Sequence, residues 1–205
     1  MSIDVALARM AQLQAAFAPP QVTASVTPMP TANAANFATT LASTQVAQAT
    51  PLPPSGGGTS AGLAALAAAK GEVGVAEQPP GSNNSPRIAQ FRQATAGSGV
   101  GPWCAYFVSW AARQAGAPLG DQGQGFGRVD DVYAWAQRTG KAIPAGEGVR
   151  PQPGDLIVWD EHIGIVESVD ADGKIHTVEG NSSDRVSERT YGPDGGGAIG
   201  YVRLG

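Results

Sequence analysis

Hydrophobic and polar residues alternate with two different periods along the chain after residue 60. In the first half of this region apolar positions recur every three or four residues, which is typical of helices. In the second half apolar and polar positions alternate with a period of two, which is typical of strands. The predicted helices span 63–70, 85–95, 103–115 and 130–139, and the predicted strands span 155–159, 162–169, 174–179, 185–191 and 198–203. Helices followed by an antiparallel sheet indicate an α+β fold.

The first sixty residues have a different pattern. Ile3, Met10 and Phe17 recur every seven residues, which predicts a short amphipathic helix over residues 1–18. This helix either frays or docks on a partner protein through residues 1–17. Residues 19–60 are rich in Ala, Thr, Ser, Pro and Gly, and they bury too little apolar surface to offset their chain entropy. We expect a disordered linker there and one globular domain over 61–205.

Composition excludes several classes of function. The chain has 205 residues, with 13 Lys and Arg against 17 Asp and Glu, so its net charge of −4 argues against a nucleic-acid-binding protein. One cysteine and two histidines allow neither an internal disulfide nor a cysteine-rich zinc site. No apolar run approaches the roughly 18 residues of a membrane span, and no secretory signal is readable at the N-terminus.

The single cysteine, Cys104, lies in the first turn of the predicted helix 103–115, after the sequence Gly99-Val100-Gly101-Pro102-Trp103. Unpaired backbone N–H groups and the helix dipole favour a thiolate at such a place. A cysteine in a helix is also often a small buried hydrophobic residue. Two interpretations of Cys104 therefore stand, a nucleophile and a core residue.

His162 begins the predicted strand 162–169, directly after Trp159-Asp160-Glu161. A lone histidine here is either an ordinary surface residue or a catalytic base. A cysteine at the start of a helix, with a histidine at the start of a distant strand, is the arrangement of papain-like thiol hydrolases. In that chemistry the imidazole takes the thiol proton and later protonates the leaving amine.

A third group should orient the imidazole, and His176 and Glu179 are the two candidates. The predicted strands 162–169 and 174–179 are joined by the turn residues Asp170-Ala171-Asp172-Gly173. If Val169 pairs with Lys174 across this turn, Glu179 lies opposite Gly164 and one step inward from the histidine.

The same register places Asn181 opposite His162 and His176 on the other face of the sheet. A slip of one residue puts His176 opposite Ser168, about 20 Å from His162 at ~3.3 Å per residue. We therefore predict that Glu179 orients the ring and that Asn181 either donates to an oxyanion or steadies the ring. The ordinary alternatives are a strand-end carboxylate for Glu179 and a turn residue for Asn181.

Four sequence blocks, PWCAYFVSWAARQAG, PGDLIVW, HIGIVESVD and TVEGN, resemble the CHAP family of cysteine- and histidine-dependent amidohydrolases and peptidases. The resemblance covers about residues 61–205 and implies a papain-like fold, with N-terminal helices packed on a C-terminal antiparallel sheet. It implies that Cys104 is the nucleophile, His162 the base and Glu179 the third member, with Asn181 assisting. The related NlpC/P60 family uses a second histidine as its third member, a place that His176 roughly occupies.

The resemblance also suggests residues near a substrate cleft. The segment GVAEQPPGSNNSPRI resembles the opening segment of these domains. Tryptophans beside the site are candidates for cleft walls, with a core role as the alternative. The predicted substrate-binding residues are Glu77, Asn83, Asn84, Trp103 and Trp159, with Trp135 as a further cleft-wall candidate. Some relatives bind calcium through acidic residues just before the nucleophile, but residues 97–103 contain none, so we expect no metal and no cofactor.

Because CHAP domains generally act on bacterial cell wall, the resemblance implies a peptidoglycan hydrolase. The expected activity is that of an N-acetylmuramoyl-L-alanine amidase or a wall endopeptidase, acting through a thioester intermediate. The alternative from another class is a catalytically silent adaptor, or an exported structural component of a flagellar or phage-tail assembly, that docks through its N-terminal helix.

The N-terminal pattern resembles the leader region of wall hydrolases encoded with flagellar components in some bacteria. A wall substrate without a readable signal peptide leaves three delivery routes: flagellar-type export, injection on a phage tail, and release by lysis as in endolysins. A flagellar or phage component is accordingly the partner expected for residues 1–17.

Overall fold

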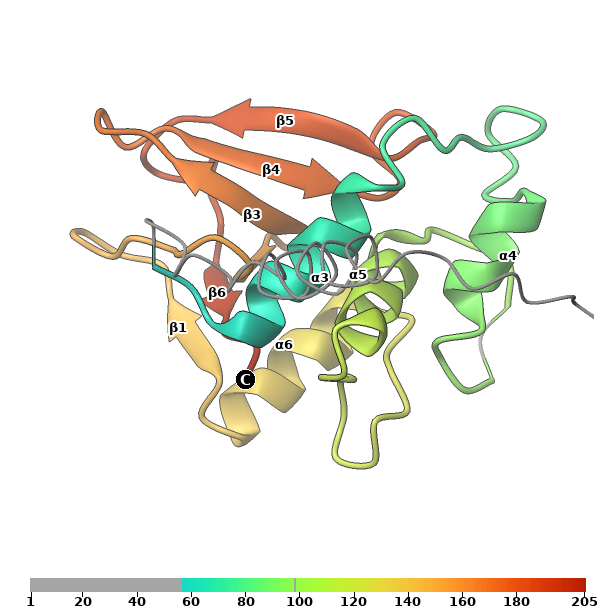
Figure 1. Ribbon diagram of the computed structural model, residues 1–205, viewed down its shortest axis with the longest axis horizontal. Helices are drawn as coiled ribbons and strands as arrows, with labels where there is room; N and C mark the ends of the chain where they lie inside the picture. The colour runs from blue at the N-terminus through green and yellow to red at the C-terminus, as the bar shows by residue number, and fades with distance from the viewer. Residues whose placement is uncertain (1–56, 98) are drawn as a thin grey trace, which may run out of the picture. The chain divides into compact units, whose positions relative to one another are not determined.

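The computed structural model describes residues 57–97 and 99–205. The amphipathic helix predicted over 1–18 and most of the linker predicted over 19–60 lie outside these residues. Within the described part, helices come first in the chain and strands follow (Figure 1). The helices are α3 (Ser60–Lys70), α4 (Pro86–Arg92), α5 (Cys104–Gln114) and α6 (Val129–Arg138).

The strands form one antiparallel sheet in the order β1-β6-β2-β3-β4-β5. They are β1 (Ala142–Pro144), β2 (Leu156–Val158), β3 (Ile163–Val169), β4 (Ile175–Glu179), β5 (Ser187–Tyr191) and β6 (Gly200–Val202). The α+β fold expected from the order of the two periods is confirmed. Strand β1 was not predicted, because three residues are too few to show an alternating pattern.

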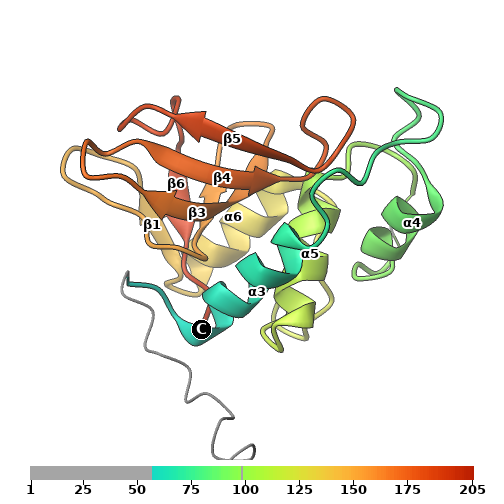
Figure 2. The same cartoon turned by 45° about the horizontal axis from the view of Figure 1, so that its top comes forward.

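Helices α3, α5 and α6 cover one face of the sheet, and α4 packs on α5 away from the sheet (Figures 1 and 2). The main core lies between the helices and this face, and Phe107 and Ile163 are among its fully buried residues. Successive residues of a strand point to opposite faces, so Ile157 and Val166 belong to a second, smaller cluster on the other face. No helix of the described residues is long and apolar enough to cross a membrane.

Polar side chains explain where two of the helices begin. Ser85 Oγ accepts a hydrogen bond from Ile88 N (3.2 Å), and Pro86 occupies the first helical position of α4. Thr59 accepts in the same way from Gly62 N (2.9 Å). Helix α3 therefore begins at Ser60, one residue before the predicted start of the domain.

Strands β3 and β4 pair in two registers. Near the start of β3, Ile165 pairs with Val178, which is the register that places Glu179 opposite Gly164. An irregularity between Val166 and Ser168 shifts the partner by one residue, so that Ser168 lies opposite His176. The bulge explains why one chain contains both registers that the sequence allowed.

The expected pairing of Val169 with Lys174 is consequently wrong. Val169 pairs with Ile175, because the bulge adds one residue on the β3 side before the turn. The register that this pairing implied nevertheless occurs between the start of β3 and the end of β4, where Ile165 pairs with Val178.

Candidate active site

Cys104 is the first residue of α5 and lies at an uncapped helix start. Trp103, the residue before it, makes no side-chain hydrogen bond to the helix. The first backbone hydrogen bond of the helix runs from Phe107 N to Trp103 O (2.9 Å). The N–H groups of the first turn, that of Cys104 included, therefore have no acceptor within the helix.

The Cys104 side chain is 4% exposed, yet it lines a cavity of about 450 Å³. Three segments that are distant in the sequence form the cavity: the loop and first turn of α5, the start of α6 and the turn before β3. Its lining residues are Gly101, Pro102, Cys104, Tyr106, Gly127, Arg128, Val129, Asp130, Asp160 and Glu161. The thiol is thus buried by its own domain but opens into a space that a ligand can enter.

The imidazole of His162 lies between Cys104 and Glu179. Its Nε2 is 2.8 Å from Glu179 Oε2, and the Cys104 side chain is a second neighbour whose interaction with the ring raises the pKa of His162. Burial lowers the pKa of His162, but hydrogen bonding to Cys104 and to Glu179, together with their negative charges, outweighs burial and raises the pKa from 6.5 to about 9. The surroundings therefore favour a charged imidazolium at neutral pH.

Glu179 is almost completely buried, with 1% of the residue exposed. Its Oε1 accepts hydrogen bonds from Thr177 Oγ1 (2.6 Å) and from the Tyr191 hydroxyl (2.8 Å), while Oε2 faces His162. Burial raises the pKa of Glu179, but the hydrogen bonds from His162, Thr177 and Tyr191 have the larger combined effect and lower it. The carboxylate is thus held in its charged form inside the protein.

Aromatic rings support the His162 ring. The Trp159 indole stacks on the imidazole with a centroid distance of 5.5 Å and an interplanar angle of 28°. Trp159 Nε1 donates to Gly195 O (2.8 Å), and the same indole packs against the Tyr191 ring at 4.9 Å. Trp159 was predicted to bind substrate; in the structure it contacts the His162 ring, and substrate binding stays a prediction.

Tyr191 and Thr177 were missed by sequence reasoning. Thr177 shares a strand face with Glu179 at a spacing of two residues, a signal that was available in the sequence. Tyr191 pairs with Ile175 in the sheet, and its long side chain reaches along the strand to Glu179. No local sequence pattern carries this second contact, because it depends on how β4 and β5 pair.

Two glycines allow the elements of the site to approach each other. A Cβ atom on Gly164 would lie 2.7 Å from Glu179 Cγ, and one on Gly180 would lie 2.5 Å from Phe107 Cβ. Gly164 therefore makes room for the Glu179 side chain beneath β3. Gly180 allows the end of β4 to rest on α5, the helix that begins with Cys104.

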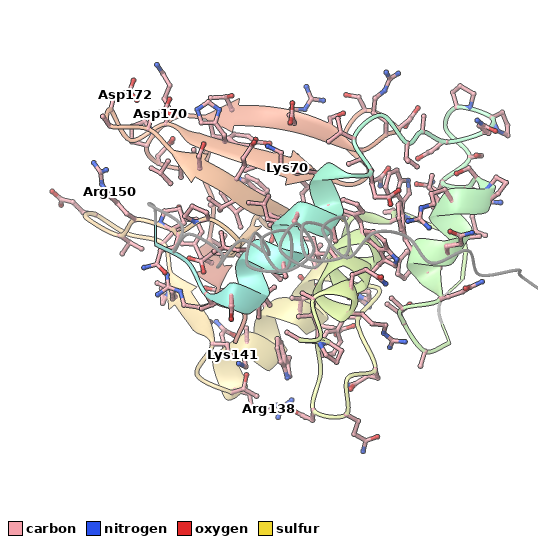
Figure 3. The ribbon with its side chains drawn as sticks, viewed as in Figure 1. Lys70, Arg138, Lys141, Arg150, Asp170 and Asp172 are labelled. Atoms are coloured by element: carbon pink, nitrogen blue, oxygen red, sulfur yellow. The ribbon has the colours of Figure 1, made fainter. Side chains whose placement is uncertain are left out.

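The structure does not bring His176 to His162. His176 Nε2 lies 2.9 Å from Asp170 Oδ2, and its Nδ1 lies 3.1 Å from Thr190 Oγ1. Asp170 marks the β3–β4 turn, at the end of the sheet away from the start of β3 (Figure 3). Of the two candidates for the third group, Glu179 alone contacts the His162 ring.

Asn181 follows Glu179 by two residues and has a left-handed backbone conformation with φ of 59°. Extension of the β3–β4 register places it opposite His162. Among the described residues its side chain forms no hydrogen bond that would define its role. Assistance to the oxyanion or to the ring therefore stays a prediction.

Glu77 and Trp103 are buried against each other, which corrects their expected contact with substrate. Trp103 has no exposed surface, and its Nε1 donates to Glu77 Oε1 (2.9 Å). Glu77 Oε2 accepts from Asn83 N (2.7 Å). The pair fixes the opening segment to the start of α5, so both residues support the position of Cys104 from inside the core.

Asn83 and Asn84 do not line the cavity that contains Cys104. Asn84 Oδ1 accepts from Arg92 Nη2 (2.6 Å), and Asn83 adopts a left-handed conformation with φ of 52°. Both shape the turn before α4, and their expected contact with substrate stays a prediction. Trp135 is 7% exposed and packs on Phe126 at 5.9 Å, which makes it a core residue.

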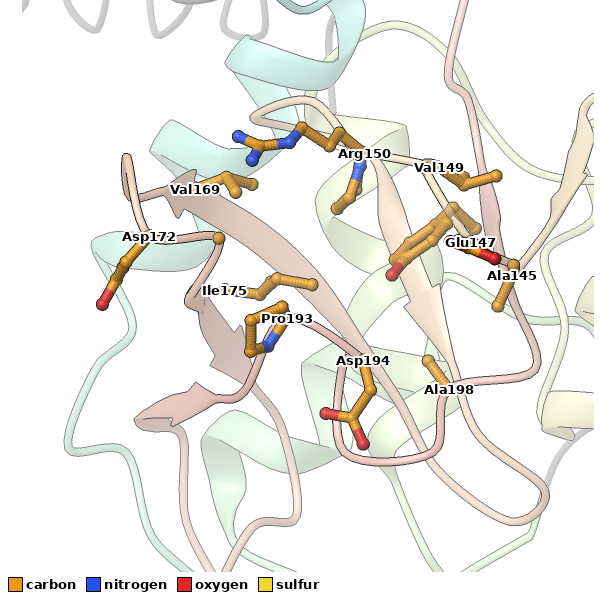
Figure 4. Close-up of a pocket in the computed structure, with 15 residues that line it drawn as sticks. Ala145, Glu147, Val149, Arg150, Val169, Asp172, Ile175, Pro193, Asp194 and Ala198 are labelled. Carbon is orange, nitrogen blue, oxygen red and sulfur yellow. The ribbon is translucent and has the colours of Figure 1, made fainter.

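Another cavity, of about 570 Å³, shares no residue with the one that contains Cys104. Its walls include Arg150, Val169, Ile175 and Asp194, near the β3–β4 turn (Figure 4). Within the described residues no three His, Cys, Asp or Glu side chains gather at metal-binding distances. Of Cys104, His162 and Glu179, Cys104 lines the cavity of about 450 Å³, and none of the three lines the other.

The substitution Glu77→Gln should lower the free energy of unfolding by about 1–3 kcal/mol, because one of two buried donors then loses its acceptor. Urea unfolding measures this, and the exposed Glu147→Gln serves as a control, with a change within about 0.5 kcal/mol. Unchanged stability combined with weaker substrate binding would show instead that Glu77 is a substrate-binding residue.

The substitution Gly164→Ala should displace the Glu179 side chain and destabilise the protein by about 1–3 kcal/mol, because the new methyl group has no space. The Gly99→Ala variant is the matched control, since a Cβ atom there meets nothing within 4 Å. Urea unfolding of both variants is the measurement. Equal stability of the two would show that the Gly164 contact does not constrain Glu179.

The His162 ring should titrate with a midpoint near pH 9, and the midpoint should fall by at least about one pH unit in Glu179→Gln. Since the folded-state pKa exceeds 6.5, protonation of His162 stabilises the fold fully below that pH, and this contribution is lost as the pH rises through 9. NMR of the ring nitrogens, assigned with His176→Ala, measures both midpoints. An unchanged midpoint in Glu179→Gln contradicts the assignment.

Residues 95–181 match the family model described as the CHAP domain. A solved structure of N-acetylmuramoyl-L-alanine amidase from Staphylococcus aureus is similar, with 19% identity and a TM-score of 0.39; the match covers 53% of this chain and 33% of the amidase, about a third of its length. No curated protein matches the chain. Cys104, His162 and Glu179 all lie within the matched residues, which are similar to the CHAP domain.

Proposed function

We propose that this protein hydrolyses amide bonds of peptidoglycan, as an N-acetylmuramoyl-L-alanine amidase or a wall endopeptidase. In this proposal Cys104 is the nucleophile, His162 the base and Glu179 the residue that orients the base. The observation that carries it is the position of the His162 ring between Cys104 and the buried Glu179 carboxylate. The family match over residues 95–181 supports the same class of chemistry.

The reaction begins with the thiolate–imidazolium pair. The sulfur attacks the amide carbon, and the carbonyl oxygen becomes an oxyanion. The Cys104 N–H, which has no helical acceptor, is placed to donate to that oxygen. The imidazolium then protonates the leaving amine as the C–N bond breaks, which leaves a thioester on Cys104.

Hydrolysis of the thioester completes the cycle. His162, now neutral, removes a proton from a water molecule, whose oxygen attacks the thioester carbon. The C–S bond breaks, the carboxylic acid product leaves, and the proton held by His162 restores the ion pair with the sulfur. Glu179 keeps the ring in one orientation through both steps, because its carboxylate accepts from Nε2 throughout.

Trp159 and Tyr191 act as positioning residues in this proposal. The indole limits rotation of the imidazole from one side, and its own position is set by the hydrogen bond to Gly195 O. Tyr191 holds Oε1 of Glu179, so that Oε2 remains directed at His162. Such support matters because misplaced catalytic groups lose much of their rate enhancement.

The site of action proposed here is the cell wall. Residues 1–17 lie outside the described part of the chain, so docking on a flagellar or phage component stays a prediction. The same holds for the route of delivery, whether flagellar-type export, a phage tail or lysis.

Replacement of Cys104 by alanine should reduce hydrolysis of purified sacculi at least about a thousandfold, because the reaction loses its nucleophile. The thermal stability should change little, since alanine fits the space of a small buried side chain. Release of new amino groups from sacculi is the measurement. Full activity in this variant would refute a cysteine mechanism and would leave another active group as the explanation.

Two further variants separate the candidates for the third member. Glu179→Gln should slow hydrolysis about tenfold or more, since the ring loses its charged partner. His176→Ala should leave the rate unchanged, because His176 bonds to Asp170 and Thr190 instead. The reverse outcome would assign the role to His176.

A further inference from the structure

The cavity that contains Cys104 has an uneven charge distribution. Asp160 and Glu161, the two residues that precede His162 in the sequence, line it. Within the described residues neither forms an ion pair. Elsewhere in the cavity wall, Arg128 Nη2 lies 3.4 Å from Asp130 Oδ2, so the charges of these two side chains offset each other. We call Asp160 and Glu161 the acidic lip.

The acidic lip is held in place by the strand pair that carries the base. Trp159 N donates to His162 O (2.8 Å), which closes a tight turn with only the two lip residues between them. The turn joins β2 to β3, whose paired residues begin with Val158 and Ile163. The two carboxylates therefore have a defined position relative to the imidazole, although their side chains are exposed.

A substrate must enter this cavity if the proposed function is right. Cys104 is more than nine-tenths buried and opens into it, so a scissile amide can reach the sulfur only by occupying the same space. Groups that flank the amide then lie beside the acidic lip. The lip is therefore part of the surface against which the substrate is selected.

Electrostatics decides which flanking groups are favoured. The thiolate–imidazolium pair is neutral as a unit, and the nearby carboxylate of Glu179 adds a further negative charge. Over distances shorter than the Debye length, about 8 Å at physiological ionic strength, the lip attracts cations and repels anions. The Arg128–Asp130 pair does not reverse this sign.

We infer that the acidic lip selects substrates that carry a free ammonium group close to the scissile amide. This inference rests on the proposed function and adds a substrate class to it: wall peptides whose amino groups are unsubstituted. Asp160 and Glu161 are specificity-determining residues, and they take no part in bond making or breaking.

The test compares native sacculi with sacculi whose free amino groups have been acetylated, which removes their positive charge. The wild-type protein should release peptide ends from native sacculi about three- to tenfold faster than from acetylated sacculi, as expected for two exposed charge interactions. In the double variant Asp160→Asn/Glu161→Gln the two rates should become equal, through a slower rate on native sacculi. Higher salt should reduce the wild-type preference.

The control variant is Glu147→Gln/Asp194→Asn, which removes the same number of charges at the separate cavity of Figure 4 and should keep the preference. A preference that persists in the lip variant would overturn the inference, because acetylation would then act through size. Equal wild-type rates on both substrates would overturn it too, while leaving the proposed hydrolysis intact. Failure to hydrolyse either substrate would instead refute the proposed function.

Discussion

The arrangement of the site depends on one hydrogen bond, between His162 Nε2 and the buried carboxylate of Glu179. A charged carboxylate inside a protein is costly unless donors replace its water. Here the imidazole, the Thr177 hydroxyl and the Tyr191 hydroxyl do so. The same contacts that make the burial of Glu179 tolerable also fix the ring that faces Cys104, so stability and ring orientation share one cause.

The rest of the domain can be understood from what this contact requires. The β3–β4 pair must bring Glu179 beneath the start of β3, which only a glycine at position 164 permits without displacement. The end of β4 must rest on α5, where Gly180 receives Phe107. Inside the core, Trp103 and Glu77 hold the start of that helix. Backbone proximity, rather than additional polar groups, thus assembles the site.

Buried and exposed charges have different effects at this site. Burial lowers the pKa of His162, but hydrogen bonds and charge interactions with Cys104 and Glu179 outweigh it and raise the pKa to about 9. Asp160 and Glu161 lie at the rim, where water and salt weaken each interaction. In the reaction we propose, the buried groups carry the chemistry, and the weaker exposed groups choose between substrates that differ in charge.

The sequence alone determined the class of fold, the order of helices and strands, and the residues with reactive side chains. Those features follow from local periodicity and from short motifs around Cys104, His162 and Glu179, which depend on neighbouring residues only. The sequence was also enough to separate Glu179 from His176, because neither of the two registers that it allowed brings His176 to His162, although the pairing expected at the turn was wrong.

Tertiary structure decided which polar residues face a ligand and which are buried. Glu77 and Trp103 were expected in the substrate cleft, but they pack on each other, since a buried indole N–H needs an acceptor. Strand β1, the bulge after Val166 and the contact of Tyr191 with Glu179 depend on partners distant in the chain. No local sequence pattern predicts such contacts, because they form only when segments that are distant in the chain pack together in the core.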